Sequence, residues 1–181
     1  MGLRNDRERY GAVSVLLHWL VALAVFGLFG LGLWMTGLTY YDAWYTRAPW
    51  LHKGIGVTLL AVVILRLAWR FVSPPPPPPA THAPWERRGA ALAHGLLYLL
   101  LLTVMATGYL ISTADGRPLE VFGLFTIPAL VTGIERQEDV AGNLHLVLAS
   151  TLVGLAALHA LAALKHHFID ADRTLLRMLG R

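Results

Sequence analysis

Long stretches without a charged side chain constrain this chain more than any other feature. A helix needs about 20 predominantly apolar residues to cross a bilayer, because lipid offers backbone amides no hydrogen-bond partner. Three stretches of sufficient length contain no Asp, Glu, Lys or Arg: Tyr10 to Tyr41, Gly89 to Ala114 and Val140 to Leu164. A fourth, about Leu51 to Val72, carries charges only near its ends, where long side chains reach the membrane surface. Only 14% of the residues are charged, against about a quarter in soluble domains, which argues against a soluble enzyme.

We therefore predict an all-α membrane protein, a single integral membrane domain over residues 1–181 built as a four-transmembrane-helix bundle. The predicted spans are residues 12–38, 51–72, 89–113 and 140–165. The first is too long for the apolar region of a signal peptide, about 7–15 residues, and is interpreted as a retained span.

Two loops are expected between these spans. Six consecutive prolines, Pro74 to Pro79, end the second span, and we interpret the loop at 73–84 as a stiff tether rather than a docking motif for a proline-binding partner. Within the other loop, at 114–139, the segment 118–133 is interrupted by Pro128. It is too short to cross and is expected at the membrane interface.

Lys and Arg are distributed unevenly between the two ends of the predicted bundle. The two termini and the region from 66 to 88 hold eleven of the 15, whereas the opposite side holds four, beside six acidic residues. Cytoplasmic loops carry an excess of Lys and Arg, so both termini and the 73–84 loop are predicted to face the cytoplasm, and the 114–139 loop the outside. The basic residues form no single patch, so the net charge of +4 does not indicate nucleic-acid binding.

Five histidines lie inside predicted spans, although an ionisable side chain in hydrocarbon costs several kcal/mol unless it is paired or coordinated. They are His18, His52, His94, His145 and His159. In the last span, His145 and His159 lie fourteen residues apart, which is about 21 Å along a helix and within about 40° of the same face. Other spans offer a matching imidazole at each depth: His52 for His145, and His18 for His159, with His94 as the alternative to His18.

Opposed imidazoles without a nearby carboxylate or thiolate favour a planar metal macrocycle, haem b, held non-covalently through both axial positions. The chain has no Cys, which excludes iron–sulfur clusters, thiolate zinc sites and haem attached through a C-x-x-C-H motif. Any single histidine could instead bond to a helix carbonyl, but two cross-helix pairs at matched depths favour haem. Arg66 and Arg70 are candidates for binding the propionates of an inner haem, although a positive-inside anchor explains them equally well. Gly32 is among the glycines that would let a wide ring approach a backbone, or simply pack helices.

A series of short motifs follows the chain from end to end. They are His18-Trp19, His52, the RLxxR pattern from Arg66 to Arg70, ALAHGLLYLL around His94, FGLFTIP from Phe122 to Pro128, the His145 to His159 spacing, and the closing HALAALKHHF and TLLRML. In this order they resemble the bacterial cytochrome b561 family of four-helix, two-haem quinone reductases, which includes the superoxide oxidase of bacterial inner membranes. The resemblance covers essentially the whole chain.

The resemblance implies two b haems per chain, ligated by His52 with His145 and by His18 with His159. It implies a multi-pass protein of the bacterial cytoplasmic (inner) membrane, in which electrons pass from extracytoplasmic superoxide to ubiquinone. It also suggests a quinone site at His166, seven residues beyond His159 on the same helical face.

Two residues are the candidate catalytic groups of that reaction. His166 would serve the quinone, with an interfacial role for His166 and His167 as the alternative. Because the outer side carries no net positive charge, attraction of superoxide would have to be local, around Lys53 with Arg47 and Arg117.

Two further hypotheses remain at this point. The chain could be a cytochrome b electron-transfer subunit that relays electrons between a dehydrogenase- or hydrogenase-type partner and the quinone pool. It could also be a haem-free helical scaffold, which an absorption spectrum would distinguish. The short loops and the lack of a visible extra domain favour a stand-alone oxidoreductase with no obligate protein partner.

Overall fold

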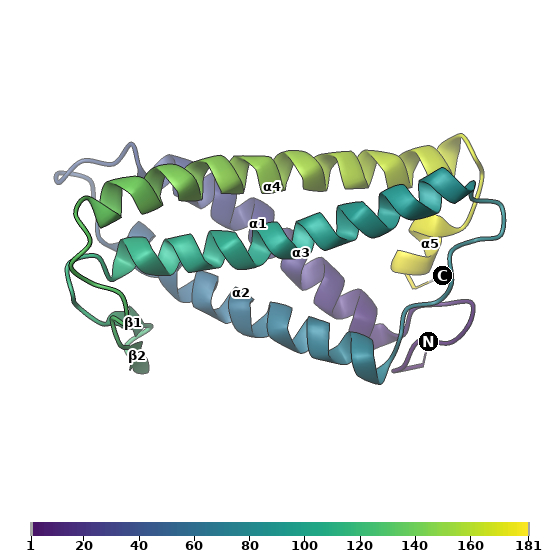
Figure 1. Cartoon of the computed structure of the whole chain (residues 1–181), viewed down its shortest axis with the longest axis horizontal. Helices are drawn as coiled ribbons and strands as arrows, with labels where there is room; N and C mark the ends of the chain where they lie inside the picture. Colours follow the sequence, from purple (N-terminus) through teal and green to yellow (C-terminus); the bar gives the residue numbers. More distant parts are fainter. Residues whose placement is uncertain (1, 181) are drawn as a thin grey trace. The chain divides into compact units, whose positions relative to one another are not determined.

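The protein, described here by a computed structural model of residues 2–180, is mainly helical (Figure 1). Its elements, in order, are α1 (Ala12–Met35), α2 (Arg47–Val72), α3 (Pro84–Ser112), β1 (Leu119–Val121), β2 (Phe125–Ile127), α4 (Gln137–Phe168) and α5 (Thr174–Met178). The first four helices are long and apolar enough to cross a membrane. The predicted fold class, a helical membrane protein with four spanning helices, is confirmed.

The surfaces of these helices are as apolar as their interiors. Large side chains such as Leu16, Ile64 and Leu158 are 60%, 53% and 64% exposed. A soluble protein rarely leaves so much contiguous apolar surface open, whereas contact with lipid tails requires it.

Three helices begin before the apolar stretches that predicted them, whereas α1 ends at Met35, before the predicted end at residue 38. α2 begins at Arg47 rather than near residue 51, α3 at Pro84 rather than 89, and α4 covers Gln137–Phe168 rather than 140–165. Acidic residues occupy the first turns of α3 and α4, and basic residues the last turn of α4. These charges interact favourably with the helix dipole, so the helices continue beyond the hydrocarbon limit. α2 ends at Val72, directly before Ser73 and the proline run, as predicted.

The chain forms two compact units, and each of the four long helices contributes a segment to both. The first unit contains Met1–Leu23, Val62–Tyr98 and Gly154–Arg181; the second contains Ala24–Ala61 and Leu99–Val153. By sequence, the first unit therefore contains both chain ends and the eleven Lys and Arg residues assigned to the cytoplasmic side. The second contains the other four.

In the first unit, the N-terminal loop is tied to the end of α2. The amide of Asn5 donates to the carbonyl oxygens of Ser73 and Pro74, at 2.8 and 3.1 Å, and its backbone N–H donates to Ser73 Oγ at 2.8 Å. Trp69 of α2 donates to Ser14 Oγ of α1 at 3.1 Å, and Trp19 donates to the carbonyl of Met178 in α5 at 2.9 Å. The bonds from the Asn5 amide satisfy carbonyl oxygens at the end of α2 that the following prolines, which lack N–H donors, cannot satisfy.

In the second unit, strands β1 and β2 form an antiparallel hairpin that the sequence analysis does not predict. Leu119 pairs with Ile127 and Val121 with Phe125. At the turn, Phe122 and Gly123 have φ of +53° and +72°, the positive values of a type I′ turn. Phe122, a bulky residue in a strained region, packs edge-on against Trp50 with ring centroids 5.1 Å apart.

The hairpin packs against α2 at Gly54. A Cβ atom added at Gly54 would lie 2.5 Å from two atoms of the Phe122 ring, which is closer than real Cβ contacts. The missing Cβ of Gly54 therefore makes room for the Phe122 ring rather than for a cofactor.

The rest of the 114–139 loop is anchored by two polar side chains, Tyr109 and Gln137. Tyr109 donates to the carbonyl of Pro128 and accepts from the N–H of Leu130, both at 2.7 Å. Gln137 is buried and donates to the carbonyls of Leu110 and Val131, at 3.0 and 3.2 Å. These contacts hold the end of α3, the loop and the start of α4 together.

We predict that Gly54→Ala lowers the free energy of unfolding by about 1–3 kcal/mol, because the methyl group overpacks the Phe122 ring. Gly56→Ala is the matched control, since a Cβ there meets no atom within 4 Å and alanine favours a helix by about 1 kcal/mol. Thermal or denaturant unfolding in detergent measures both variants. Equal stability of the two would contradict this packing.

Candidate functional site

Two of the predicted histidines meet in the second unit. The ring centroids of His52, on α2, and His145, on α4, lie 6.1 Å apart with the ring planes at 69°. Two metal–imidazole bonds of about 2 Å each, together with the distance from each bonding nitrogen to its ring centre, add up to about 6 Å. The two rings therefore stand at the separation of axial ligands on one metal ion.

The hydrogen bonds of His145 determine which of its ring nitrogens carries the proton. Nδ1 lies 2.9 Å from the carbonyl oxygen of Val104 and 3.1 Å from Oγ1 of Thr107. A carbonyl only accepts, so Nδ1 is the donor and Nε2 keeps its lone pair. Histidines that ligate metals usually donate their other N–H in this way.

Each ring of this pair packs against a glycine of a neighbouring helix. A Cβ at Gly32 of α1 would lie 3.2 Å from Cε1 of His52, and one at Gly108 of α3 would lie 3.1 Å from Cε1 of His145. Gly32, for which the sequence left open either a wide ring or plain helix packing, therefore makes room for an imidazole of the neighbouring helix. Nδ1 of His52 is buried and has no hydrogen-bond partner within residues 2–180.

The first unit brings together three imidazoles. The ring centroid of His159, on α4, lies 6.3 Å from that of His18, on α1, and 5.2 Å from that of His94, on α3. The longer separation matches two axial ligands of one metal ion, and the shorter one is too small. His18 therefore lies at the separation expected for the predicted pairing with His159. His94, the alternative to His18, lies closer to His159.

Arg66 restricts the role of His18. Its guanidinium lies 3.0 Å from Nδ1 of His18. Since a guanidinium only donates, Nδ1 is the acceptor here and Nε2 carries the proton. Ligation of a metal by Nε2 requires the proton on Nδ1, so Arg66 must then release His18. Arg66 and Arg70 both lie over the ring of Tyr98, each 5.7 Å from its centroid.

His166 lies among carboxylates in the first unit. Its Nδ1 is 2.7 Å from Oδ2 of Asp170 and 3.3 Å from Oδ2 of Asp172, and its side chain is 13% exposed. Lys165 forms ion pairs with Asp170, at 2.7 Å, and with Glu86, at 3.1 Å. The hydrogen bond from Lys165 lowers the pKa of Asp170. Burial alone would raise the pKa of Asp172, but its hydrogen bonds outweigh burial and lower it, so both carboxyls are ionised at neutral pH.

The predicted anion-attracting residues differ in their surroundings. Arg117 is 84% exposed and lies 3.4 Å from Asp115, which offsets its charge. Lys53 is exposed on α2 directly after His52 and forms no ion pair with the part of the chain that the structure describes. Arg47 is also exposed and forms no ion pair within residues 2–180, so Lys53 and Arg47 are both more available than Arg117.

The comparison with known proteins decides the family. Residues 9–181 match the family described as prokaryotic cytochrome b561. The chain belongs to that family. It is 51% identical over 181 residues to cytochrome b561 homolog 2 of Escherichia coli (strain K12), covering all of this chain and 96% of that protein.

Two other relatives of the cytochrome b561 protein carry different names. A protein of Yersinia pestis named probable superoxide oxidase CybB is 29% identical over 177 residues, covering 96% of this chain and 97% of that one. Cytochrome b562 of Cereibacter sphaeroides is 31% identical over 176 residues, covering 94% of each. The protein is therefore a multi-pass bacterial membrane protein of electron transfer, and its family implies that it binds haem b.

The residues present fit this cofactor. Both clusters consist of imidazoles, which are the usual axial ligands of non-covalent haem, and the chain contains no competing thiolate. In the second unit, the free lone pair of His145 and the orphaned buried nitrogen of His52 match a pair of haem ligands. The sequence does not predict the contacts of His145 with Thr107, Val104 and Gly108. No local pattern indicates that a carbonyl or a glycine neighbours a histidine.

We predict that Gly108→Val weakens haem binding in the second unit by roughly 10–100-fold, as for the loss of other groups that orient a ligating histidine. The added side chain must push the His145 ring away from Val104. Gly89→Val is the control, since this glycine of α3 is exposed and a Cβ there meets no atom within 4 Å. The haem-to-protein ratio measures the effect, and an unaltered ratio in Gly108→Val would contradict it.

Proposed function

We propose that this protein is a di-haem superoxide oxidase of the bacterial cytoplasmic (inner) membrane, which passes single electrons from extracytoplasmic superoxide to ubiquinone. One observation carries the proposal: imidazole pairs with centroid separations of 6.1 Å and 6.3 Å, one in each unit of the fold. The relative named as a probable superoxide oxidase supports the choice of donor.

His52 and His145 would hold one haem and His18 and His159 the other. When bound, the haems supply one-electron redox chemistry. Two superoxide anions lose two electrons and leave as two dioxygen molecules, while one ubiquinone takes up two electrons and two protons. The protein would contribute imidazole ligands, surroundings of low dielectric, and protons for the quinone.

The first unit is proposed to lie at the cytoplasmic side. It contains both chain ends and eleven of the 15 Lys and Arg residues, the distribution that positive-inside topology requires. The second unit then receives superoxide. Its four basic and six acidic residues give no net attraction, so Lys53 would act locally, next to the ligand His52.

Proton supply to ubiquinone is assigned to His166. An imidazole at the membrane surface can donate a proton to a reduced quinone oxygen and be recharged from the cytoplasm. The carboxylates of Asp170 and Asp172 lie 2.7 and 3.3 Å from its Nδ1. A cavity of about 320 Å³, lined in part by Asp170 and Asp172, supplies a route for water to these carboxylates.

We predict that His145→Ala removes mainly the haem of the second unit and His159→Ala mainly the haem of the first, because each haem needs both imidazoles. His18→Ala should also lose the first-unit haem, and His94→Ala should retain it, since only His18 lies at the axial separation from His159. Haem content and low-spin absorption spectra measure these losses. Two haems with unchanged spectra in His145→Ala or His159→Ala would refute the assignment, and the reverse order for His18 and His94 would make His94 the ligand.

The activity itself is tested by stopped-flow mixing of the purified holoprotein with superoxide and then with a soluble ubiquinone. The haem bands should become reduced and then reoxidised. In His166→Leu, reduction by superoxide should be unchanged, but reoxidation should slow by at least about tenfold, as for the loss of a positioned proton donor. His167→Leu is the adjacent control and should reoxidise normally.

Lys53→Gln tests the outer side in the same experiment. Reduction by superoxide should slow and become less sensitive to ionic strength, because a local attraction of the anion is lost. If superoxide does not reduce the haems of the wild type, the proposed superoxide oxidase activity is wrong and the electron-relay subunit is favoured. Unchanged reoxidation in His166→Leu would remove His166 from the quinone site.

A further inference from the structure

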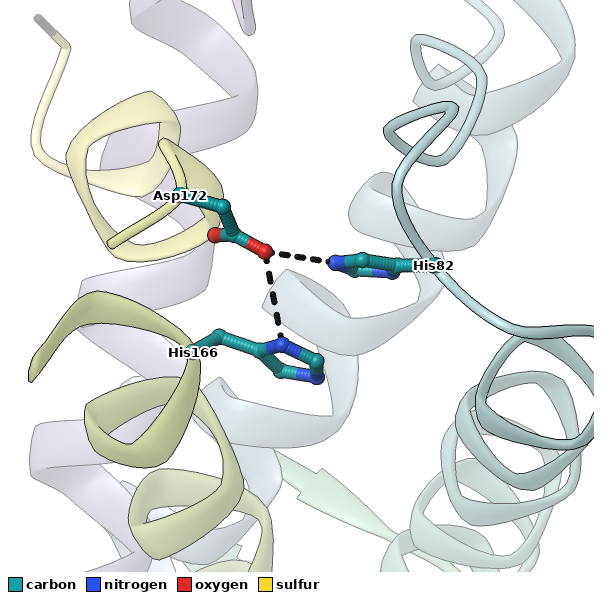
Figure 2. A group of neighbouring side chains, drawn as sticks. All are labelled: His82, His166 and Asp172. Carbon is teal, nitrogen blue, oxygen red and sulfur yellow. Dashed lines mark hydrogen bonds and ion pairs between the residues drawn. The ribbon is translucent and has the colours of Figure 1, made fainter. Parts of the chain in front are cut away.

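We propose that His82, His166 and Asp172 form a zinc-binding site in the first unit. A ring nitrogen of each histidine lies close to the same carboxylate oxygen, Oδ2 of Asp172 (Figure 2). The site is separate from the histidines assigned to haem, and it does not depend on the proposed superoxide oxidase activity, although both use His166.

The ligand atoms stand at suitable separations. Nε2 of His82 lies 2.7 Å from Oδ2 of Asp172, and Nδ1 of His166 lies 3.3 Å from the same oxygen. The three atoms all lie within 4.8 Å of one another. Two ligands at about 2.0–2.1 Å from a tetrahedral zinc ion are about 3.3–3.4 Å apart. The rings of His82 and His166 are stacked, with centroids 4.3 Å apart and planes at 21°, so one ring must turn out of the stack to bring all three atoms within bonding distance of one ion.

Nδ1 of His166 is the atom that most needs a partner. It is buried, and although two carboxylate oxygens lie 2.7 and 3.3 Å away, neither contact has the direction of a hydrogen bond. A buried polar atom without a hydrogen bond costs about 1–3 kcal/mol. A cation that accepts its lone pair would satisfy it.

The surroundings add charge and space. Glu86 and Asp170 form a second group of possible ligands around His166, and both also pair with Lys165. A cavity of about 320 Å³ opens beside His82 and Asp172, which leaves room for a water molecule in a fourth position. The side chains of His82, His166 and Asp172 are only 10%, 13% and 9% exposed, so the site is sheltered.

The donor atoms select among metals. Two imidazole nitrogens and one carboxylate oxygen match sites in which zinc has three protein ligands and an open position. Mg²⁺ and Ca²⁺ prefer oxygen ligands alone, which this cluster does not offer. The three residues come from the loop before α3, the last turn of α4 and the loop before α5, and His82 and Asp172 are 90 residues apart in the chain.

The proposal is tested by titrating the detergent-solubilised holoprotein, prepared without a polyhistidine tag, with Zn²⁺ in competition with a fluorescent chelator. One zinc ion should bind per chain. His82→Gln and Asp172→Asn should each weaken binding by at least about tenfold, because each removes a ligand. The matched controls are His167→Gln and Asp139→Asn, which remove an imidazole and a carboxylate outside the cluster and should bind zinc as the wild type does.

The haem absorption spectrum of each variant confirms that it is folded, and His82, which lies in a loop, is the variant least able to disturb the helices. X-ray absorption at the zinc edge then identifies the ligands without interference from haem iron. Two nitrogen neighbours are expected in the wild type and one in His82→Gln. Three results would overturn the site. The first is the absence of stoichiometric zinc binding, and the second is binding by His82→Gln and Asp172→Asn that equals wild-type binding. The third is a zinc shell of oxygen atoms alone.

Discussion

The need to satisfy every polar group inside hydrocarbon governs the structure. Hydroxyl side chains within the long helices do so locally: Thr58, Thr103 and Ser150 each donate to a carbonyl four residues earlier in their own helix, at 2.8–2.9 Å. An imidazole is too large to fold back in this way. The ring nitrogens of the histidines in the spans therefore need partners on other helices or on a metal ion. This need is consistent with their clustering in each of the two units.

The cluster of the second unit shows how helix packing prepares a ligand. The carbonyl of Val104 fixes the proton of His145 on Nδ1, and Gly108, one turn further along α3, lets the helix approach the ring. Gly32 of α1 does the same for His52 of α2. Orientation by a backbone carbonyl and by the absence of a Cβ adds no charge, which suits a site surrounded by lipid.

In the first unit, charged side chains gather around the last turn of α4 and the loop that follows it. Lys165 bridges two carboxylates, and the ionised carboxylates in turn hold His166 and His82. Such contacts are weak when fully solvated, but the side chains of His82, His166 and Asp172 are only 9–13% exposed, so their geometry is better defined than that of an ordinary surface pair. The same shelter makes the cluster suitable for a proton donor and for a metal ion.

The sequence alone determined the fold class, the four spans, the histidines at two depths and the distribution of basic residues, because helix length, apolarity and periodicity are properties of consecutive residues. Only the tertiary structure decided which side chains meet. In the structure, His18 and His94 both lie beside His159. Gly54 packs against Phe122, and Gly108 packs against His145. His82 forms a hydrogen bond with Asp172. The hairpin at 119–127 also depends on its contact with α2. These pairings arise from packing between segments far apart in the chain, where a one-residue rotation of a helix changes the partner, and no local pattern encodes that rotation.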